Sequence, residues 1–293
     1  MSRKFIFAVI LLLSAAVLIM TSCRDDSLQQ THDSENEYTA VDKVQQIEDD
    51  AIHNPDNDKS KTSVLPRIGI YAGSGSWDVN VVALQHFLDQ YGFEWTLFDE
   101  QAIETVDLAE KFEIIWFPGG FSADYKYSIT SHANIRSFIE NGGSYIGSCA
   151  GAYYASDIMC WLGSDYDYPL NLFDGKGIGP LAGLIAWGEI ASFSLEEGHP
   201  ANSGFERSIE MYYFDGPYFE PYNSDTIEVL ARYSANQEPA VIAGRFVSGK
   251  YLLLGPHPEL GGYTPDSPDF SVDGQEGAQW PWLYSMLCWF ILW

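Results

Sequence analysis

The chain has 293 residues, of which 46% are hydrophobic and 15% aromatic, a composition typical of a folded globular protein and not of a disordered or collagen-like one. Forty-one acidic residues stand against 15 basic ones, and the resulting net charge of −26 would repel phosphates, so we expect no nucleic-acid partner. Four cysteines are too few for a small disulfide-stabilised scaffold.

Residues 1–22 have the pattern of an export signal. Arg3 and Lys4 precede an apolar run over residues 5–20, which is too short to favour a membrane-spanning helix. The run leads directly to Cys23 and resembles the lipobox of bacterial lipoproteins. This resemblance implies cleavage before Cys23 and a lipid on that cysteine, so we expect a lipoprotein held at a membrane of the cell envelope. A plain signal peptide or an anchor helix is the alternative.

Residues 23–63 predict an acidic, flexible tether. Residues 24–63 contain eleven acidic and four basic side chains, and Tyr38 is their only aromatic residue. Such a segment buries too little apolar surface to offset its ordering entropy. The folded domain is therefore expected over residues 64–293.

The first half of this domain predicts strands and helices in alternation. Strands are expected over residues 67–72, 93–98, 113–117 and 144–148. Helices are expected over residues 79–88, around residues 135–139 and over residues 150–161. This order predicts an α/β fold with a mainly parallel central sheet, in which loops at the carboxyl ends of the strands form the site.

The second half is richer in strands. Candidates cover residues 184–193, 208–214, 227–233, 240–246 and 251–254. Few helices separate them, so we expect an antiparallel extension of the sheet. The apolar residues 282–293 are too few to cross a bilayer and predict a last helix packed on the sheet.

Cys149 is the candidate nucleophile. Residues 147–151 read Gly-Ser-Cys-Ala-Gly at a predicted strand-to-helix junction, where the glycines allow the tight turn of a nucleophile elbow. The positive end of the helix dipole favours a thiolate at this position. The competing interpretation is a buried structural cysteine, the usual state of a lone cysteine.

His257 and Glu259 are the candidate base and its orienting acid. Both follow the predicted strand over residues 251–254, and residues two apart in extended chain point the same way. His199 is the other histidine considered, but it lies in a predicted loop near glutamates only. A capping or surface histidine is the alternative interpretation of His257.

Two backbone N–H groups, those of Gly120 and Ala150, are candidates for an oxyanion hole. Gly120 ends the Pro-Gly-Gly run that follows a neighbouring strand; a plain glycine turn is the alternative. No cluster has convincing metal-ligand spacing, and the glycine-rich residues 73–76 lack a phosphate-binding lysine, so neither a metal nor a cofactor is expected. We expect Cys160 and Cys288 to be free thiols in the core, and a disulfide between them is the alternative.

Three motifs in order, residues 118–120, 147–151 and 257–259, resemble the class I glutamine amidotransferase superfamily. More narrowly, residues 149–154, 212–219 and 255–260 resemble the N-terminal domain of biotin–protein ligases. The resemblance covers residues 67 to 293. It implies a flavodoxin-like α/β sandwich with a Cys149–His257–Glu259 triad. Because only 34 residues follow Glu259, we expect no biotin ligase catalytic domain and no biotin ligation.

Two functions remain open from the sequence. The first is a lipid-anchored cysteine hydrolase or amidotransferase-like enzyme acting on an amide or ester of a small molecule or peptide. The second is a binding module that uses the same cleft without turnover. Tyr153, Tyr154 and Tyr218 are expected to contact the ligand in either case, with core packing as their alternative role. The substrate and the oligomeric state stay open.

Overall fold

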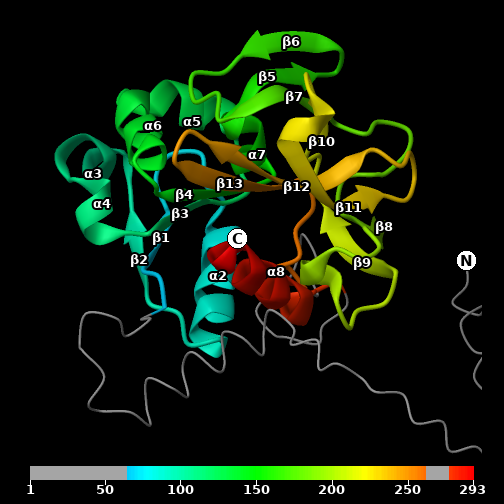
Figure 1. Ribbon diagram of the computed structural model, residues 1–293. Helices are drawn as coiled ribbons and strands as arrows, with labels where there is room; N and C mark the ends of the chain where they lie inside the picture. The colour runs from blue at the N-terminus through cyan, green and yellow to red at the C-terminus, as the bar shows by residue number, and fades with distance from the viewer. Residues whose placement is uncertain (1–64, 262–276) are drawn as a thin grey trace, which may run out of the picture. The chain divides into compact units, whose positions relative to one another are not determined.

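The computed structural model describes residues 65–261 and 277–293. Cys23, the expected signal peptide and the expected tether all lie outside these residues. A nine-stranded sheet forms the centre of the fold, in the order β2-β1-β3-β4-β13-β12-β11-β8-β9 (Figure 1). Its strands are β1 Ile68–Tyr71, β2 Trp95–Phe98, β3 Ile114–Phe117, β4 Ser144–Ser148, β8 Glu189–Leu195, β9 Ser208–Tyr213, β11 Ile227–Tyr233, β12 Pro239–Phe246 and β13 Gly249–Leu254.

The type of strand pairing changes once across this sheet, from parallel to antiparallel. Strands β2, β1, β3, β4 and β13 pair in parallel, and β12, β11, β8 and β9 continue from β13 by antiparallel pairing. The prediction of a mainly parallel sheet with an antiparallel extension is therefore confirmed.

Helices cover both faces of the parallel part. They are α2 Asp78–Gln90, α3 Glu100–Thr105, α4 Leu108–Lys111, α5 Ser122–Ser128, α6 His132–Glu140, α7 Ala150–Ala155 and α8 Trp280–Leu292, with short 3-10 turns at Pro200–Asn202 and Ser224–Thr226. Figure 1 shows α2 and α8 on one face and α3 to α7 on the other.

The two faces of each parallel strand belong to two separate hydrophobic cores. In β3, Ile114 and Trp116 pack with α2 and α8, whereas Ile115 and Phe117 pack with the helices of the opposite face. The alternation follows from the period of two in a strand. Both faces are apolar because both are covered, and this is why the strands appear in the sequence as continuous apolar runs.

The predicted helix over residues 150–161 is wrong in its second half. Helix α7 ends at Ala155, and residues Ser156–Trp161 form strand β5 of a second sheet. The order of that sheet is β10-β7-β5-β6, with β6 Ser164–Asp167, β7 Phe173–Gly179 and β10 Tyr218–Pro221. A short apolar run fits a helix and a strand equally well, and pairing with β6 and β7 decides in favour of the strand.

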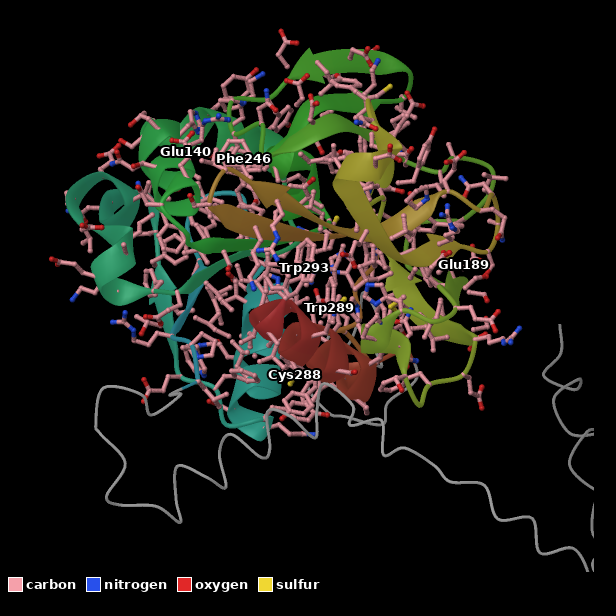
Figure 2. The ribbon with its side chains drawn as sticks, viewed as in Figure 1. Glu140, Glu189, Phe246, Cys288, Trp289 and Trp293 are labelled. Carbon is pink, nitrogen blue, oxygen red and sulfur yellow. The ribbon has the colours of Figure 1, made fainter. Side chains whose placement is uncertain are left out.

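The expected C-terminal helix is present as α8. Figure 2 shows Cys288, Trp289 and Trp293 on and just after this helix. The rings of Trp289 and Trp293 stack with centroids 5.1 Å apart, and Cys288 is fully buried. Cys149, Cys160 and Cys288 form no disulfide with one another. Within the described ranges, no helix is long and apolar enough to cross a membrane.

Candidate active site

Three adjacent parallel strands bring the predicted site residues to one edge of the sheet. Gly120 follows β3, Cys149 follows β4 and His257 follows β13, and β4 pairs with both β3 and β13. The Cys149 N–H donates to the carbonyl of Leu254 at 2.7 Å, which joins the turn after β4 to the end of β13. The carboxyl edge of a parallel sheet is where α/β proteins commonly bind ligands.

Cys149 lies in a strained turn between β4 and α7. Its φ of 48° and ψ of −101° are unusual for a residue with a side chain. The turn is possible because its neighbours are small: a Cβ on Gly151 would lie 2.1 Å from the carbonyl oxygen of Phe117. The Cys149 side chain is buried, with 5% of the residue exposed. Strain of this kind at a cysteine is the geometry of a nucleophile elbow.

His257 and Glu259 form a fully buried pair. The imidazole Nδ1 lies 2.8 Å from Glu259 Oε1, and neither residue is exposed. Backbone hydrogen bonds hold the segment: the His257 N–H donates to the Tyr212 carbonyl at 3.0 Å, and Trp280 Nε1 of α8 donates to the Glu259 carbonyl at 2.8 Å. The pair is therefore fixed by both β9 and the C-terminal helix.

Asn80 of α2 completes a three-residue cluster that the sequence analysis missed. Its Nδ2 lies 2.8 Å from Glu259 Oε1 and 2.9 Å from His257 Nδ1, and Asn80 is fully buried. An ionised Glu259 accepts from both Nδ1–H and Nδ2–H, which leaves the Nε2 side of the ring for a second partner. Asn80 carried no sequence signal, since a single amide near the start of a helix belongs to no recognisable motif.

The pKa of His257 is raised to about 10 in this cluster. Burial alone would lower it, but the Glu259 carboxylate and the Cys149 side chain favour the imidazolium more strongly. The Nε2 atom of His257 is buried and has no hydrogen-bond partner among the described residues. The Cys149 thiol instead donates to the Phe214 carbonyl at 3.4 Å. The structure thus brings all three predicted residues together.

The two residues expected to form the oxyanion hole lie at the same cavity as the thiol. Gly120 and Ala150 line one cavity with Cys149, and neither N–H donates a hydrogen bond within residues 65–261 and 277–293. A Cβ on Gly120 would lie 1.9 Å from the Gly75 carbonyl oxygen, so only glycine fits this turn. A Cβ on Gly119 would lie 2.5 Å from Cε1 of His257, so this glycine makes room for the ring. Both N–H groups thus have no partner in the part of the chain that the structure describes, and their role as an oxyanion hole stays a prediction.

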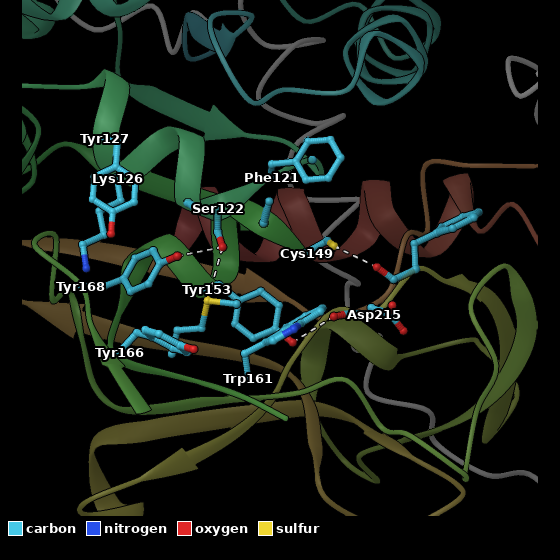
Figure 3. Close-up of a pocket in the computed structure, with 15 residues that line it drawn as sticks. Phe121, Ser122, Lys126, Tyr127, Cys149, Tyr153, Trp161, Tyr166, Tyr168 and Asp215 are labelled. Carbon is cyan, nitrogen blue, oxygen red and sulfur yellow. Dashed lines mark hydrogen bonds between the residues drawn. The ribbon is translucent and has the colours of Figure 1, made fainter. Parts of the chain in front are cut away.

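The cavity beside Cys149 has a volume of about 340 Å³ and is walled mainly by aromatic side chains (Figure 3). One wall comes from α5 and α7 and the other from β5, β6 and the turn after β9. The aromatic residues that line it are Phe121, Tyr127, Tyr153, Trp161, Tyr166, Tyr168 and Phe214. The size and the apolar lining are those of a small-molecule site.

The three tyrosines proposed from the sequence occupy different places. Tyr153 lines the cavity and donates from its hydroxyl to the Asp215 carbonyl at 2.9 Å. Tyr154 is fully buried in the core and its hydroxyl lies 2.7 Å from His132 Nδ1. Tyr218 belongs to β10 and pairs with Ile178 of β7. Only Tyr153 is among the residues that line the cavity.

His199, the rival base, lies elsewhere. Its Nε2 is 3.3 Å from Glu228 Oε2, and its ring packs on Trp289 with centroids 4.5 Å apart. Burial lowers the pKa of this histidine. Within the described ranges there is no cluster of three or more His, Cys, Asp or Glu residues able to hold a metal ion.

Comparison with models of known protein families shows to which family the chain belongs. A family model described as the N-terminal domain of biotin–protein ligase matches residues 67–273. The chain belongs to this family. All the site residues above lie inside the matched range.

Two curated relatives are similar to this member of the biotin–protein ligase N-terminal family. A biotin–protein ligase of Schizosaccharomyces pombe (strain 972 / ATCC 24843) is 25% identical over 211 residues, which is 65% of this chain and 33% of the ligase. An uncharacterized protein of Chlamydia muridarum (strain MoPn / Nigg) is 29% identical over 173 residues, 54% of this chain and 63% of that protein. The chain thus spans one third of the first relative and less than two thirds of the second.

A solved structure supports the fold. The crystal structure of a glutamine amidotransferase superposes with a TM-score of 0.51 at 18% identity, covering 75% of this chain and 97% of that one. The fold expected from the sequence resemblance, a glutamine amidotransferase-like α/β sandwich, is confirmed at this level.

Proposed function

We propose that the protein is a cysteine hydrolase or amidotransferase-like enzyme that cleaves an amide or ester of a small molecule or peptide. One observation carries the proposal: a strained, buried Cys149 stands beside a buried His257–Glu259 pair at the edge of an apolar cavity. Packing alone gives no reason to bury a carboxylate–histidine pair next to such a turn, because burying charged groups costs free energy.

The chemistry assigns one task to each group. The Cys149 thiolate attacks the carbonyl carbon, and the N–H groups of Gly120 and Ala150 stabilise the oxyanion that forms. The imidazolium of His257 gives its Nε2 proton to the leaving amine or alcohol as the C–N or C–O bond breaks, leaving a thioester. His257 then takes a proton from water, whose oxygen attacks the thioester and releases the acid. Glu259 keeps Nδ1 protonated and stabilises the charged ring.

Alkylation of Cys149 tests whether the thiol is activated. Full-length protein is treated with iodoacetamide across a pH series, and peptide mass spectrometry reports each cysteine separately. Cys149 of the wild type should react well below pH 8.5, the region of an unperturbed thiol, and His257→Ala should remove this advantage. Cys160 and Cys288 serve as internal references, and His86→Ala, at an exposed histidine, as the matched control. A Cys149 that reacts no faster in the wild type than in His257→Ala argues against the proposal.

A binding module is the second candidate function. It is favoured by the hydrogen bond from the Cys149 thiol to the Phe214 carbonyl, because His257 Nε2 has no hydrogen-bond partner among the described residues. In that case the cavity would hold its ligand without covalent chemistry. Binding that survives in Cys149→Ala, together with ordinary thiol reactivity in the wild type, would favour this function.

For the N-terminal segment we propose export of the protein and attachment of a lipid at Cys23. Residues 24–63 would then connect the lipid-bearing cysteine to the folded domain. The proposal is supported by the apolar run that ends at this cysteine. Metabolic labelling with a radioactive fatty acid should mark the wild type and leave Cys23→Ser unmarked. Equal labelling of both would argue against the anchor.

A further inference from the structure

The two sides of the cavity differ in charge. Figure 3 shows Lys126 with Tyr127 and Tyr168 on one side, and Cys149 with Asp215 on the other. Lys126 Nζ already has partners, since it donates to the Asp167 carbonyl at 2.6 Å and lies 5.1 Å from the ring centre of Tyr168. Asp215 and Lys126 are the charged residues among those that line the cavity. A positive ligand group is repelled at the Lys126 side and attracted at the Cys149 side.

Asp215 is held in place by its backbone while its carboxylate stays unpaired. The residue has φ of 60°, its carbonyl accepts from Tyr153, and the preceding carbonyl accepts from the Cys149 thiol. Within residues 65–261 and 277–293 the carboxylate takes part in no hydrogen bond or ion pair. The side chain is half-buried, and burial raises its pKa. A carboxylate partly withdrawn from water without a partner carries a cost that a ligand cation would relieve.

The part of the cavity between Lys126 and Asp215 is lined mainly by aromatic and apolar side chains. Tyr153, Met159, Trp161, Tyr166 and Tyr168 surround it, and the rings of Tyr153 and Trp161 meet edge to face with centroids 5.9 Å apart. The Ser122 hydroxyl is already hydrogen-bonded, because it lies 2.9 Å from the Tyr168 hydroxyl and 3.4 Å from the Met159 sulfur. These five side chains, called the aromatic box below, favour an aromatic or large apolar ligand group, because such a group buries apolar surface and makes ring contacts.

We propose that the cavity binds an amide or ester with a free amine beside its scissile carbonyl and an aromatic or large apolar side chain. An α-aminoacyl compound such as phenylalaninamide has this chemistry. The ammonium pairs with Asp215, the carbonyl carbon faces Cys149 and the ring enters the aromatic box. This assignment rests on the proposed function for the position of the carbonyl, while the binding of amine and ring does not require turnover.

The test measures binding without catalysis. Full-length Cys149→Ala is titrated calorimetrically with phenylalaninamide, N-acetylphenylalaninamide and alaninamide. The free amine should bind about tenfold or more tightly than its acetylated form, because acetylation removes the charge that Asp215 accepts. Alaninamide should also bind about tenfold or more weakly, because it leaves the box empty. Equal binding of the free and acetylated amides would overturn the proposal.

Asp215→Asn in the same background isolates the carboxylate. Asparagine tolerates a positive φ, so the turn is kept while the charge is removed. This variant should lose the preference for the free amine and bind the acetylated form as before. Asp124→Asn, which removes the same charge from an exposed position on α5, is the matched control and should keep the preference. Loss of binding for both amides in Asp215→Asn would instead indicate a purely structural role and overturn the assignment.

The outcomes separate this inference from the proposed function. Selective, Asp215-dependent binding combined with no release of ammonia by the wild type would support the ligand class and contradict the hydrolase. Turnover of other amides combined with no preference for the free amine would support the hydrolase and overturn the ligand class.

Discussion

Nδ1 of His257 and Oε1 of Glu259 lie 2.8 Å apart with both side chains fully removed from solvent. The pair follows β13 in the loop that also receives hydrogen bonds from α8. A charged pair so deeply buried stabilises the fold only when both members are present.

Removal of one member of the pair should be costly. Glu259→Ala should lower the free energy of unfolding by about 3–5 kcal/mol, because it leaves His257 buried without a counter-charge. Glu259→Gln keeps the shape and should cost less, yet it should also slow Cys149 alkylation because the imidazolium loses its stabilising charge. Urea unfolding and alkylation rates measure the two effects. Normal reactivity in a folded Glu259→Gln protein would argue against a triad.

The raised pKa of His257 predicts how stability depends on pH. Its value in the folded protein, about 10, exceeds the ordinary value of 6.5. The stabilisation is therefore fully present below pH 6.5 and is lost as the pH rises towards 10. Thermal unfolding of the wild type should show this decline, and the double variant His257→Gln/Glu259→Gln should show much less of it. Parallel curves for the two proteins would contradict the assigned pKa.

Asn80 should act as a positioning residue. Asn80→Ala removes a donor to the buried Glu259 oxygen and should cost about 1–3 kcal/mol of stability. It should also shift the pH profile of Cys149 alkylation, which a merely structural role would not do. Asn141→Ala, at an exposed amide directly after α6, is the control. An unchanged pH profile in a destabilised Asn80→Ala protein would assign Asn80 to packing alone.

Gly119 should be needed for the position of the imidazole. In Gly119→Ala the new Cβ would lie 2.5 Å from Cε1 of His257, so the ring must move. We expect slower alkylation of Cys149 in a protein that still folds. Gly69→Ala is the control for crowding in general, because its new Cβ would lie 3.1 Å from the Phe112 ring and this contact is not part of the site. Equal effects of the two substitutions on alkylation would argue against a specific role.

Much of this architecture could be predicted from sequence because the signals are local. The strand ending at Ser148, the glycines around Cys149 and the two-residue spacing of His257 and Glu259 each follow from nearby residues. The strand after α7 could not be predicted, since its identity depends on pairing with β6 and β7, which come later in the chain.

The parts of the site that the sequence could not indicate come from distant segments. Asn80 lies 177 residues before His257, and only the packing of α2 beside the end of β13 brings them together. Asp215 follows a strand of the antiparallel extension and reaches the cavity because the backbone after β9 turns towards Cys149. Neither residue belongs to a local pattern, so each became visible only in the fold.

Trapping of a covalent intermediate tests the central claim most directly. Full-length protein is mixed with the p-nitrophenyl ester of phenylalanine, quenched at short times and mapped by peptide mass spectrometry. The account predicts a phenylalanyl group on Cys149 that forms and disappears in the wild type, and that is much reduced in His257→Ala. Acylation of Cys149 at equal rates in the two proteins, or at no higher level than on Cys160, would contradict it.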